Sequence, residues 1–234
     1  MSGTLSVVST PIGNLQDVAL RAVETLKSVD LIACEDTRQT AKLLTRYEIR
    51  KPLVSLHEHN ERAHTPQLLE RLRAGESIAL VCDGGTPLIS DPGWRLVHRA
   101  TEERVPVTWI PGACALIGAL VLSGLPTDRF VFEGFLPAKA GARRRRLEAL
   151  RGEARTIVLY ESPHRLLAML RDIREILGDV SLACARELTK TFEEVRRGRI
   201  SEVLLHFERH TPRGEFVVVL SGRAASRGVE ANGE

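Results

Sequence analysis

The sequence has few cysteines, and they are widely spaced. The four are Cys34, Cys82, Cys114 and Cys184, and no two of them form a CxxC pair. This spacing argues against a disulfide framework or a zinc site and favours free thiols in a reducing compartment. The histidines at 57, 59 and 64 also lack the spacing of a three-ligand site. We therefore expect a protein without a bound metal.

Long apolar runs are missing as well. The longest run, 113–122, is too short to span a bilayer and is interrupted by Gly118. The N-terminus lacks the basic-then-apolar pattern of a secretory signal peptide. These features predict a cytoplasmic protein that does not enter a membrane.

The common nucleotide and hydrolase fingerprints are absent from the sequence. No GxGxxG follows the first predicted strand, and there is no Walker lysine and no GxSxG elbow. Aromatic residues make up only 4% of the chain, which argues against an extended platform for stacking bases.

What the sequence does contain is a regular alternation of apolar runs and helical patterns. Strands are predicted at 5–8, 29–34, 78–82, 105–110, 130–135, 156–160, 180–186, 192–196 and 215–220. Helices are predicted at 17–29, 37–47, 65–75, 94–103, 113–122, 142–151, 163–177 and 201–209, with Thr65 and Pro66 opening the third. This alternation favours an α/β architecture with largely parallel sheets.

We predict two α/β domains, 1–124 and 125–223, because a Gly- and Pro-containing stretch separates two runs of the pattern. The tail 224–234 is small and polar, and we expect it to be disordered.

Several polar loops follow predicted strands directly. They occupy 9–15, 35–38, 83–93 and 111–113. Because the carboxyl ends of parallel strands share one edge of a sheet, we expect these loops to converge there, where ligands bind in α/β folds. The turn at 83–93 holds two adjacent glycines and two prolines, which suit close approach of a ligand. An ordinary tight turn is the alternative.

Basic residues gather in two groups, although the net charge is only +3. The candidates for phosphate contacts are Arg143, Arg144, Arg145, Arg146, Arg196, Arg197 and Arg199. The alternative is an ordinary solvated helix face.

Eight segments, in this order along the chain, resemble motifs of the tetrapyrrole-methylase-like (class III) S-adenosylmethionine-dependent methyltransferases, in particular those that methylate rRNA. The segments are 9–15, 35–38, 83–93, 111–115, 132–137, 160–165, 185–190 and 214–219. Each motif alone is weak, but eight in order over nearly the whole chain are specific. Gly84 departs from the pattern, since alanine is usual there.

The resemblance implies two α/β domains with S-adenosylmethionine in the cleft between them, and a homodimer. It implies 2′-O-methylation of a cytidine ribose in the decoding region of small-subunit (16S) rRNA, with free rRNA or the 30S particle as partner. The resemblance also implies which residues bind the cofactor. Those of the first domain are Pro11, Gly13, Asp83, Gly84, Gly85, Thr86, Ser90, Asp91, Pro92, Ala113 and Ala115. Those of the second domain are Phe135, Leu136, Ala185, Gly214 and Glu215. Plain core packing is the alternative for Phe135 and Leu136.

Methylation of a ribose hydroxyl needs a group that takes or strongly binds its proton. The candidates are Glu35, Asp36, Arg38, Arg186 and Lys190, the last beside Glu187. The alternative is an ion-pair network between the domains.

Two rival functions stay open. One is methylation of a small tetrapyrrole by the same fold and cofactor. The other is a non-catalytic ribosome-binding scaffold, because fold alone does not establish activity.

Overall fold

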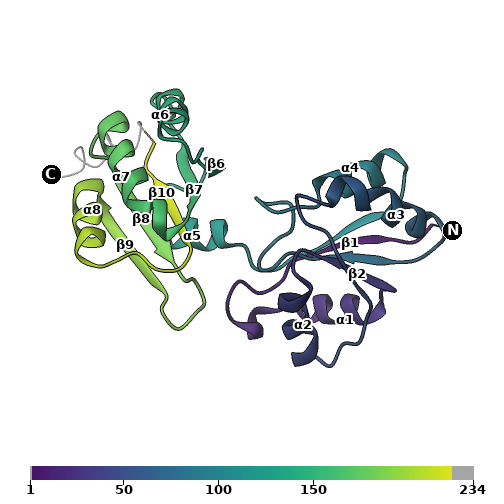
Figure 1. Ribbon diagram of the computed structural model, residues 1–234. Coiled ribbons are helices and arrows are strands. Elements are labelled where there is room, and N and C mark those ends of the chain that lie inside the picture. Colours follow the sequence, from purple (N-terminus) through teal and green to yellow (C-terminus); the bar gives the residue numbers. More distant parts are fainter. Residues whose placement is uncertain (1, 223–234) are drawn as a thin grey trace. The chain divides into compact units, whose positions relative to one another are not determined.

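The chain forms two compact units (Figure 1), Met1–Cys114 and Ala115–Glu234. The computed structural model describes residues 2–222; the predicted tail at 224–234 lies outside them. The units divide ten residues before the predicted boundary at 124, because the apolar helix α5 (Ala115–Ser123) packs against strands β8 and β10 of unit 2.

Unit 1 is built on a five-stranded, wholly parallel sheet with the order β3-β2-β4-β1-β5. The strands are β1 (Leu5–Val8), β2 (Leu31–Cys34), β3 (Leu53–Ser55), β4 (Ile78–Leu80) and β5 (Val107–Ile110). The helices are α1 (Leu20–Ser28), α2 (Thr37–Arg46), α3 (Glu61–Arg73) and α4 (Trp94–Glu102), with a short 3-10 helix at Leu15–Asp17.

Helices cover both faces of this sheet, with α1 and α2 on one side and α3 and α4 on the other (Figure 1). Alternate strand residues point to opposite faces, so the sheet divides its apolar side chains between two cores. Leu31 and Ala33 of β2 pack with the α3 and α4 residues Leu72 and Leu96. Ile32, between them in sequence, packs on the α1 and α2 side.

Unit 2 is built on a mixed five-stranded sheet with the order β6-β7-β10-β8-β9. Its strands are β6 (Phe130–Phe135), β7 (Thr156–Glu161), β8 (Ser181–Arg186), β9 (Glu194–Arg199) and β10 (Phe216–Leu220). Its helices, besides α5, are α6 (Ala140–Ala149), α7 (Pro163–Leu177) and α8 (Ile200–Arg209). Only β6 and β7 pair in parallel; the other three pairs are antiparallel.

The α/β architecture is confirmed, but three sequence predictions are wrong in detail. The second sheet is not largely parallel. Strands β8 and β9 form an antiparallel hairpin across a short connection, and β10 runs antiparallel to both of its neighbours, β7 and β8. The three-residue strand β3 was missed because so short a run carries little periodicity. Helix α3 begins at Glu61, so Thr65 lies inside it and donates its hydroxyl to the Glu61 carbonyl.

Within residues 2–222, no helix is both long enough and apolar enough to cross a membrane.

Candidate active site

The loops at the carboxyl ends of β1 and β4 are joined directly to each other. Thr10 and Gly85 exchange two backbone hydrogen bonds, 2.8 and 3.0 Å long, as an isolated antiparallel bridge. The Thr10 hydroxyl also donates to the carbonyl oxygen of Cys82 at 3.2 Å. The loop after β1 and the turn at 83–93 therefore form one rigid body at this edge of the sheet.

The loop after β5 joins the same assembly. The Thr86 hydroxyl donates to the Ala113 carbonyl at 3.1 Å and lies 3.0 Å from the Ser9 hydroxyl. A Cβ on Gly112 would lie 2.9 Å from the Ser9 Cβ, so only glycine permits this close approach. The predicted convergence of the loops on one edge is confirmed, and we call this edge the loop rim.

The turn at 83–93 has an unusual backbone. Leu88 and Ser90 adopt positive φ angles of 73° and 65°, which cost free energy for residues other than glycine. Gly85 and Gly93 adopt φ angles of 101° and 119°. Such strain concentrates at sites that bind ligands, so this is more than an ordinary tight turn.

Carboxylates gather on the loop rim. An Asp83 carboxylate oxygen accepts the backbone N–H of Asp36 at 3.0 Å, which ties the loop after β2 to the turn. Burial raises the pKa of Glu35 to about 7, and the negative charges of Asp83, Asp91, Glu58 and Asp36 add to the shift. Glu35 is therefore partly protonated near neutral pH.

Asp36 behaves in the opposite way. Hydrogen bonds from the Arg38 side chain and backbone hold the pKa of Asp36 at about 2. The two side chains form an ion pair of 2.7 Å, with Arg38 almost fully exposed. Asp36 is thus an anion near neutral pH, and it caps the N-terminus of helix α2.

The catalytic candidates from unit 2 are paired within that unit. Arg186 donates to Glu194 at 2.6 Å, and Lys190 donates to Glu187 at 3.1 Å. Glu187 has a φ of 49° and also accepts the backbone N–H of Glu215 at 3.3 Å. Each candidate ion pair therefore lies inside one unit.

The predicted cofactor residues fall into two groups. Those on the loop rim of unit 1 are Pro11, Gly13, Asp83, Gly84, Gly85, Thr86, Ser90, Asp91, Pro92 and Ala113. Ala115 begins α5 in unit 2. Gly214 and Glu215 precede β10, where a Cβ on Gly214 would collide with the Glu187 side chain.

The remaining three cofactor candidates differ in exposure. Phe135 is 53% exposed and contacts the ring of Tyr160 edge-on, with centroids 5.6 Å apart. Leu136 and Ala185 are buried, and Leu136 packs in the core of unit 2. Leu136 therefore has the core role named as its alternative, although its backbone carbonyl also accepts from Arg165.

Three of the four arginines in the run on α6 bind carboxylates. Arg143 is buried and donates to Asp172 at 2.7 Å. Arg144 binds Asp172 and Glu175, and Arg146 binds Glu133 at 2.7 Å. Arg145 is the one member of the run without a side-chain partner in the described part of the chain.

The second basic group lies on β9 at an edge of the unit 2 sheet. Arg197 donates to the carbonyl oxygen of Leu122, and Arg199 donates to that of Asp179 at 3.0 Å. Arg196 is exposed and makes no side-chain hydrogen bond or ion pair to any residue between 2 and 222. Arg145 and Arg196 therefore have the guanidinium groups best available to a phosphate.

The cysteines are unpaired thiols, three of them buried. Burial raises the pKa of Cys34, Cys82 and Cys184. In residues 2–222 no three His, Cys, Asp or Glu side chains form a group that could hold a metal ion.

Sequence reasoning missed two residues beside the rim. Glu61 is buried, and one carboxylate oxygen accepts the backbone N–H groups of Gly93 and Arg95 at 3.2 and 2.7 Å. Trp94, between them, is 59% exposed. Trp94 could have been noticed, because it is one of only two tryptophans and directly follows the turn. The sequence gives no signal for Glu61, because its partners are about 30 residues away.

Comparison with known proteins agrees with this geometry. The family model for tetrapyrrole (corrin/porphyrin) methylases matches residues 4–204. A Ribosomal RNA small subunit methyltransferase I from Synechocystis is 54% identical over 94% of this chain and 79% of its own length. The protein of the same name from Thermotoga maritima is 49% identical over 94% of this chain and 99% of its own.

The chain belongs to the ribosomal RNA small subunit methyltransferase I family of tetrapyrrole methylases. The resemblance carried by the eight motifs is thereby confirmed. Solved structures of more distant members of the tetrapyrrole methylase fold align over almost all of the chain. Uroporphyrin-III-C-methyltransferase from Thermus thermophilus aligns with a TM-score of 0.65 and 21% identity, over 97% of this chain and 98% of that one. A diphthine synthase aligns with a TM-score of 0.72 and 16% identity, over 94% and 90%.

Proposed function

We propose that this chain transfers the methyl group of S-adenosylmethionine to the 2′-hydroxyl of a cytidine ribose in the decoding region of small-subunit rRNA. Identity of about half the residues to the rRNA small subunit methyltransferases I, over nearly the whole chain, carries the proposal. The 2′-oxygen and the cytidine rest on the sequence resemblance of the eight motifs.

The loop rim suits this cofactor chemically. S-adenosylmethionine carries a sulfonium cation, and the rim gathers the carboxylates of Glu35, Asp83 and Asp91. Gly13 and Gly84 are exposed and have no side chain to cover their backbone, which favours close approach of a ligand. When bound, the cofactor supplies an electrophilic methyl group. The assignment of Phe135, Leu136, Ala185, Gly214 and Glu215 to the same cofactor stays a prediction.

Glu35 is the group that we assign as the general base. In the transfer that the bound cofactor would support, the ribose hydroxyl must lose its proton as its oxygen takes the methyl group. The hydroxyl proton passes to the Glu35 carboxylate. A base works best when its pKa lies near the working pH, and that of Glu35 is about 7. Asp36, with a pKa of about 2, is too weak a base for this step.

Methyl transfer from labelled S-adenosylmethionine to purified small ribosomal subunits, free rRNA and a blank without RNA tests the proposal. We expect label in one 2′-O-methylcytidine of the decoding region. Glu35→Gln should lower kcat by about 10² to 10⁴-fold and remove the ionisation near pH 7 from the pH profile. Glu24→Gln, which removes an exposed carboxylate from α1, is the matched control.

Each alternative has its own signature in this assay. Cofactor binding without transfer to any RNA, together with methylation of a tetrapyrrole, would replace the proposal by a small-molecule methylase. Failure to bind the cofactor in calorimetry would favour the scaffold. A normal kcat in Glu35→Gln would remove Glu35 as the base without affecting the assignment of the substrate.

We also propose that the protein acts in the cytoplasm as a homodimer. Apolar side chains are exposed on α5, where Ile117 and Val121 are 46% and 70% accessible, and on the edge strand β5, where Trp109 is 56% accessible. Such surfaces commonly serve association. Light scattering on the full chain measures the mass, and a monomer at micromolar concentration would contradict the dimer.

A further inference from the structure

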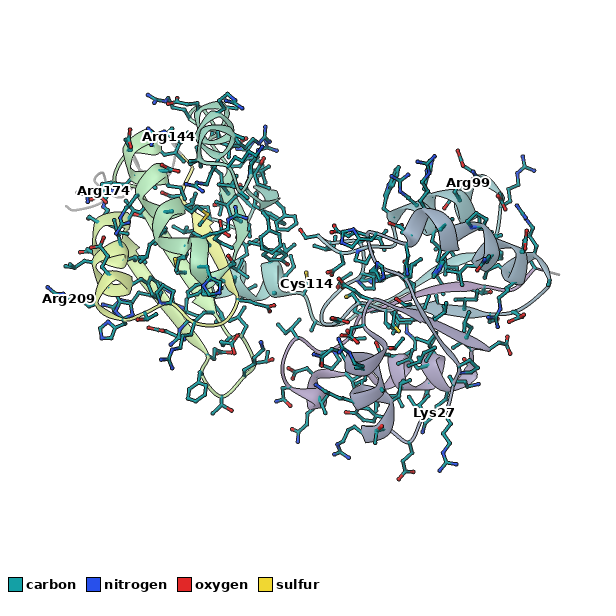
Figure 2. All side chains as sticks on the ribbon, in the orientation of Figure 1. Lys27, Arg99, Cys114, Arg144, Arg174 and Arg209 are labelled. Carbon is teal, nitrogen blue, oxygen red and sulfur yellow. The ribbon has the colours of Figure 1, made fainter. Side chains whose placement is uncertain are left out.

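A groove of about 530 Å³ runs between α3 and α4 in unit 1. Its floor contains Thr65, Pro66 and Leu69 from one face of α3. Its sides carry four arginines, two from each helix: Arg62, Arg73, Arg95 and Arg99. The groove lies on the sheet face opposite α1 and α2, as Figure 2 shows from the positions of Arg99 and Lys27.

One wall of the groove is an exposed aromatic stack. The Trp94 and His98 rings lie parallel, with centroids 5.0 Å apart and an interplanar angle of 6°. They come from adjacent turns of α4, so the helix itself sets their spacing. With Trp94 59% exposed, a flat aromatic face is open to a ligand in a protein that has only two tryptophans.

The arginines of the groove differ in whether a carboxylate binds them. Glu103 accepts from Arg73 at 2.5 Å and from Arg99 at 3.1 Å, and these bonds lower the pKa of Glu103. Arg62 and Arg95 are exposed, and neither side chain has a hydrogen bond or an ion pair to any described residue. With Glu70 as the second glutamate of the lining, the groove keeps an excess of positive charge.

The buried carboxylate of Glu61 is occupied by backbone groups and not by an arginine side chain. It accepts the backbone N–H groups of Gly93 and Arg95 at the start of α4. This bond also fixes α4 against α3 and joins the groove to the turn of the loop rim. The groove is therefore linked at its Trp94 end to the turn of the loop rim.

We propose that the groove between α3 and α4 binds a single-stranded segment of the RNA substrate, with a base on Trp94 and phosphates on Arg62 and Arg95. The combination of an aromatic face and unpaired guanidinium groups suits single strands, whose bases are free to stack. A duplex offers the arginines its phosphates but keeps its bases stacked inside. This inference rests on the proposed function, because it names a further contact of the same substrate.

Binding of a short fluorescein-labelled single-stranded oligoribonucleotide to the full chain tests the groove. Trp94→Ala should weaken binding about tenfold, and Trp94→Phe should keep most of the affinity, because a ring still stacks. Arg62→Ala with Arg95→Ala should also lower the slope of log Kd against log salt by about 1.4, since two phosphate contacts are lost. On purified small subunits, both changes should raise KM and leave kcat unaltered.

The matched control is Arg21→Ala with Lys27→Ala, which removes two exposed cations from α1 on the opposite face. The proposal would be overturned if both groove variants kept the RNA affinity, the salt slope and the KM of the wild type while methyl transfer stayed intact. A changed oligomeric mass at unchanged RNA affinity would overturn it as well and assign the groove to protein association. If the wild-type chain fails to methylate RNA while the groove variants still lose oligonucleotide affinity, the proposed function fails and the groove stands.

Discussion

Units 1 and 2 each bury a carboxylate beside arginines, and they satisfy it in different ways. In unit 2, Asp172 binds both Arg143 and Arg144. In unit 1, Glu61 binds two backbone N–H groups and leaves Arg62 and Arg95 without a carboxylate. The run of four arginines that is conspicuous in the sequence is thus mainly structural. In unit 1, Arg62 and Arg95, which belong to no such run, are free to bind a ligand.

The largest effect should come from breaking the buried pair in unit 2. Asp172→Ala leaves the buried guanidinium of Arg143 without its counter-charge, and such a loss costs about 3 to 5 kcal/mol. Hydrogen exchange of the β7, β8 and β10 amides measures the opening free energy of unit 2 separately from unit 1.

Glu175→Ala is the control for this change, because it removes a largely exposed partner of Arg144. It should cost less than about 1 kcal/mol. Equal hydrogen-exchange protection in Asp172→Ala and Glu175→Ala would show that the buried pair of Arg143 does not stabilise unit 2. The proposed difference between the arginines of the two units would then be wrong.

A smaller effect is expected for the buried carboxylate of unit 1. Glu61→Ala leaves the N–H groups of Gly93 and Arg95 without an acceptor and should destabilise the α3–α4 pair by about 1 to 3 kcal/mol. Glu61→Gln keeps one carbonyl oxygen and should lose less. Hydrogen exchange of the α4 amides measures the stability of α4 in both variants. Unchanged protection in Glu61→Ala would show that Glu61 does not hold the start of α4 against α3.

The same contrast marks what the sequence could and could not predict. The loop rim was predictable, because parallel strands bring their following loops to one edge. The pairing of Arg143 was not, because consecutive helical residues point in different directions and Asp172 is 29 residues away. The groove combines residues of two helices about 30 positions apart, so no continuous run or motif in the sequence indicates it.

Strand direction in unit 2 escaped prediction for a related reason. Apolar periodicity identifies strands such as β8 and β10 but is the same for parallel and antiparallel neighbours. The raised pKa of Glu35 also depends on Asp91 and Glu58, which only folding brings near it.

The smallest effect on stability should come from Glu35. This carboxylate is partly buried and lies near four other carboxylates, all of which raise its pKa. Burial raises the pKa of Glu35 to about 7 from 4.5, so the unfolded chain releases this proton earlier as the pH rises. The free energy of unfolding contributed by this group therefore falls between about pH 4.5 and pH 7 and is constant above. Glutamine does not titrate, so Glu35→Gln should gain stability over wild type across that window.

The gain should be on the order of 1 kcal/mol, because solvent screens a partly exposed group. Urea unfolding at a series of pH values measures it, with Glu24→Gln as the control for losing one surface carboxylate. If the Glu35→Gln and wild-type stabilities run parallel from pH 4.5 to 7, neither burial nor the neighbouring carboxylates raise the pKa of Glu35. A gain that develops across that window and persists above pH 7 would set this carboxylate apart from Asp172, whose removal destabilises the fold. A charge kept at a cost to stability is the behaviour expected of a residue that serves the reaction.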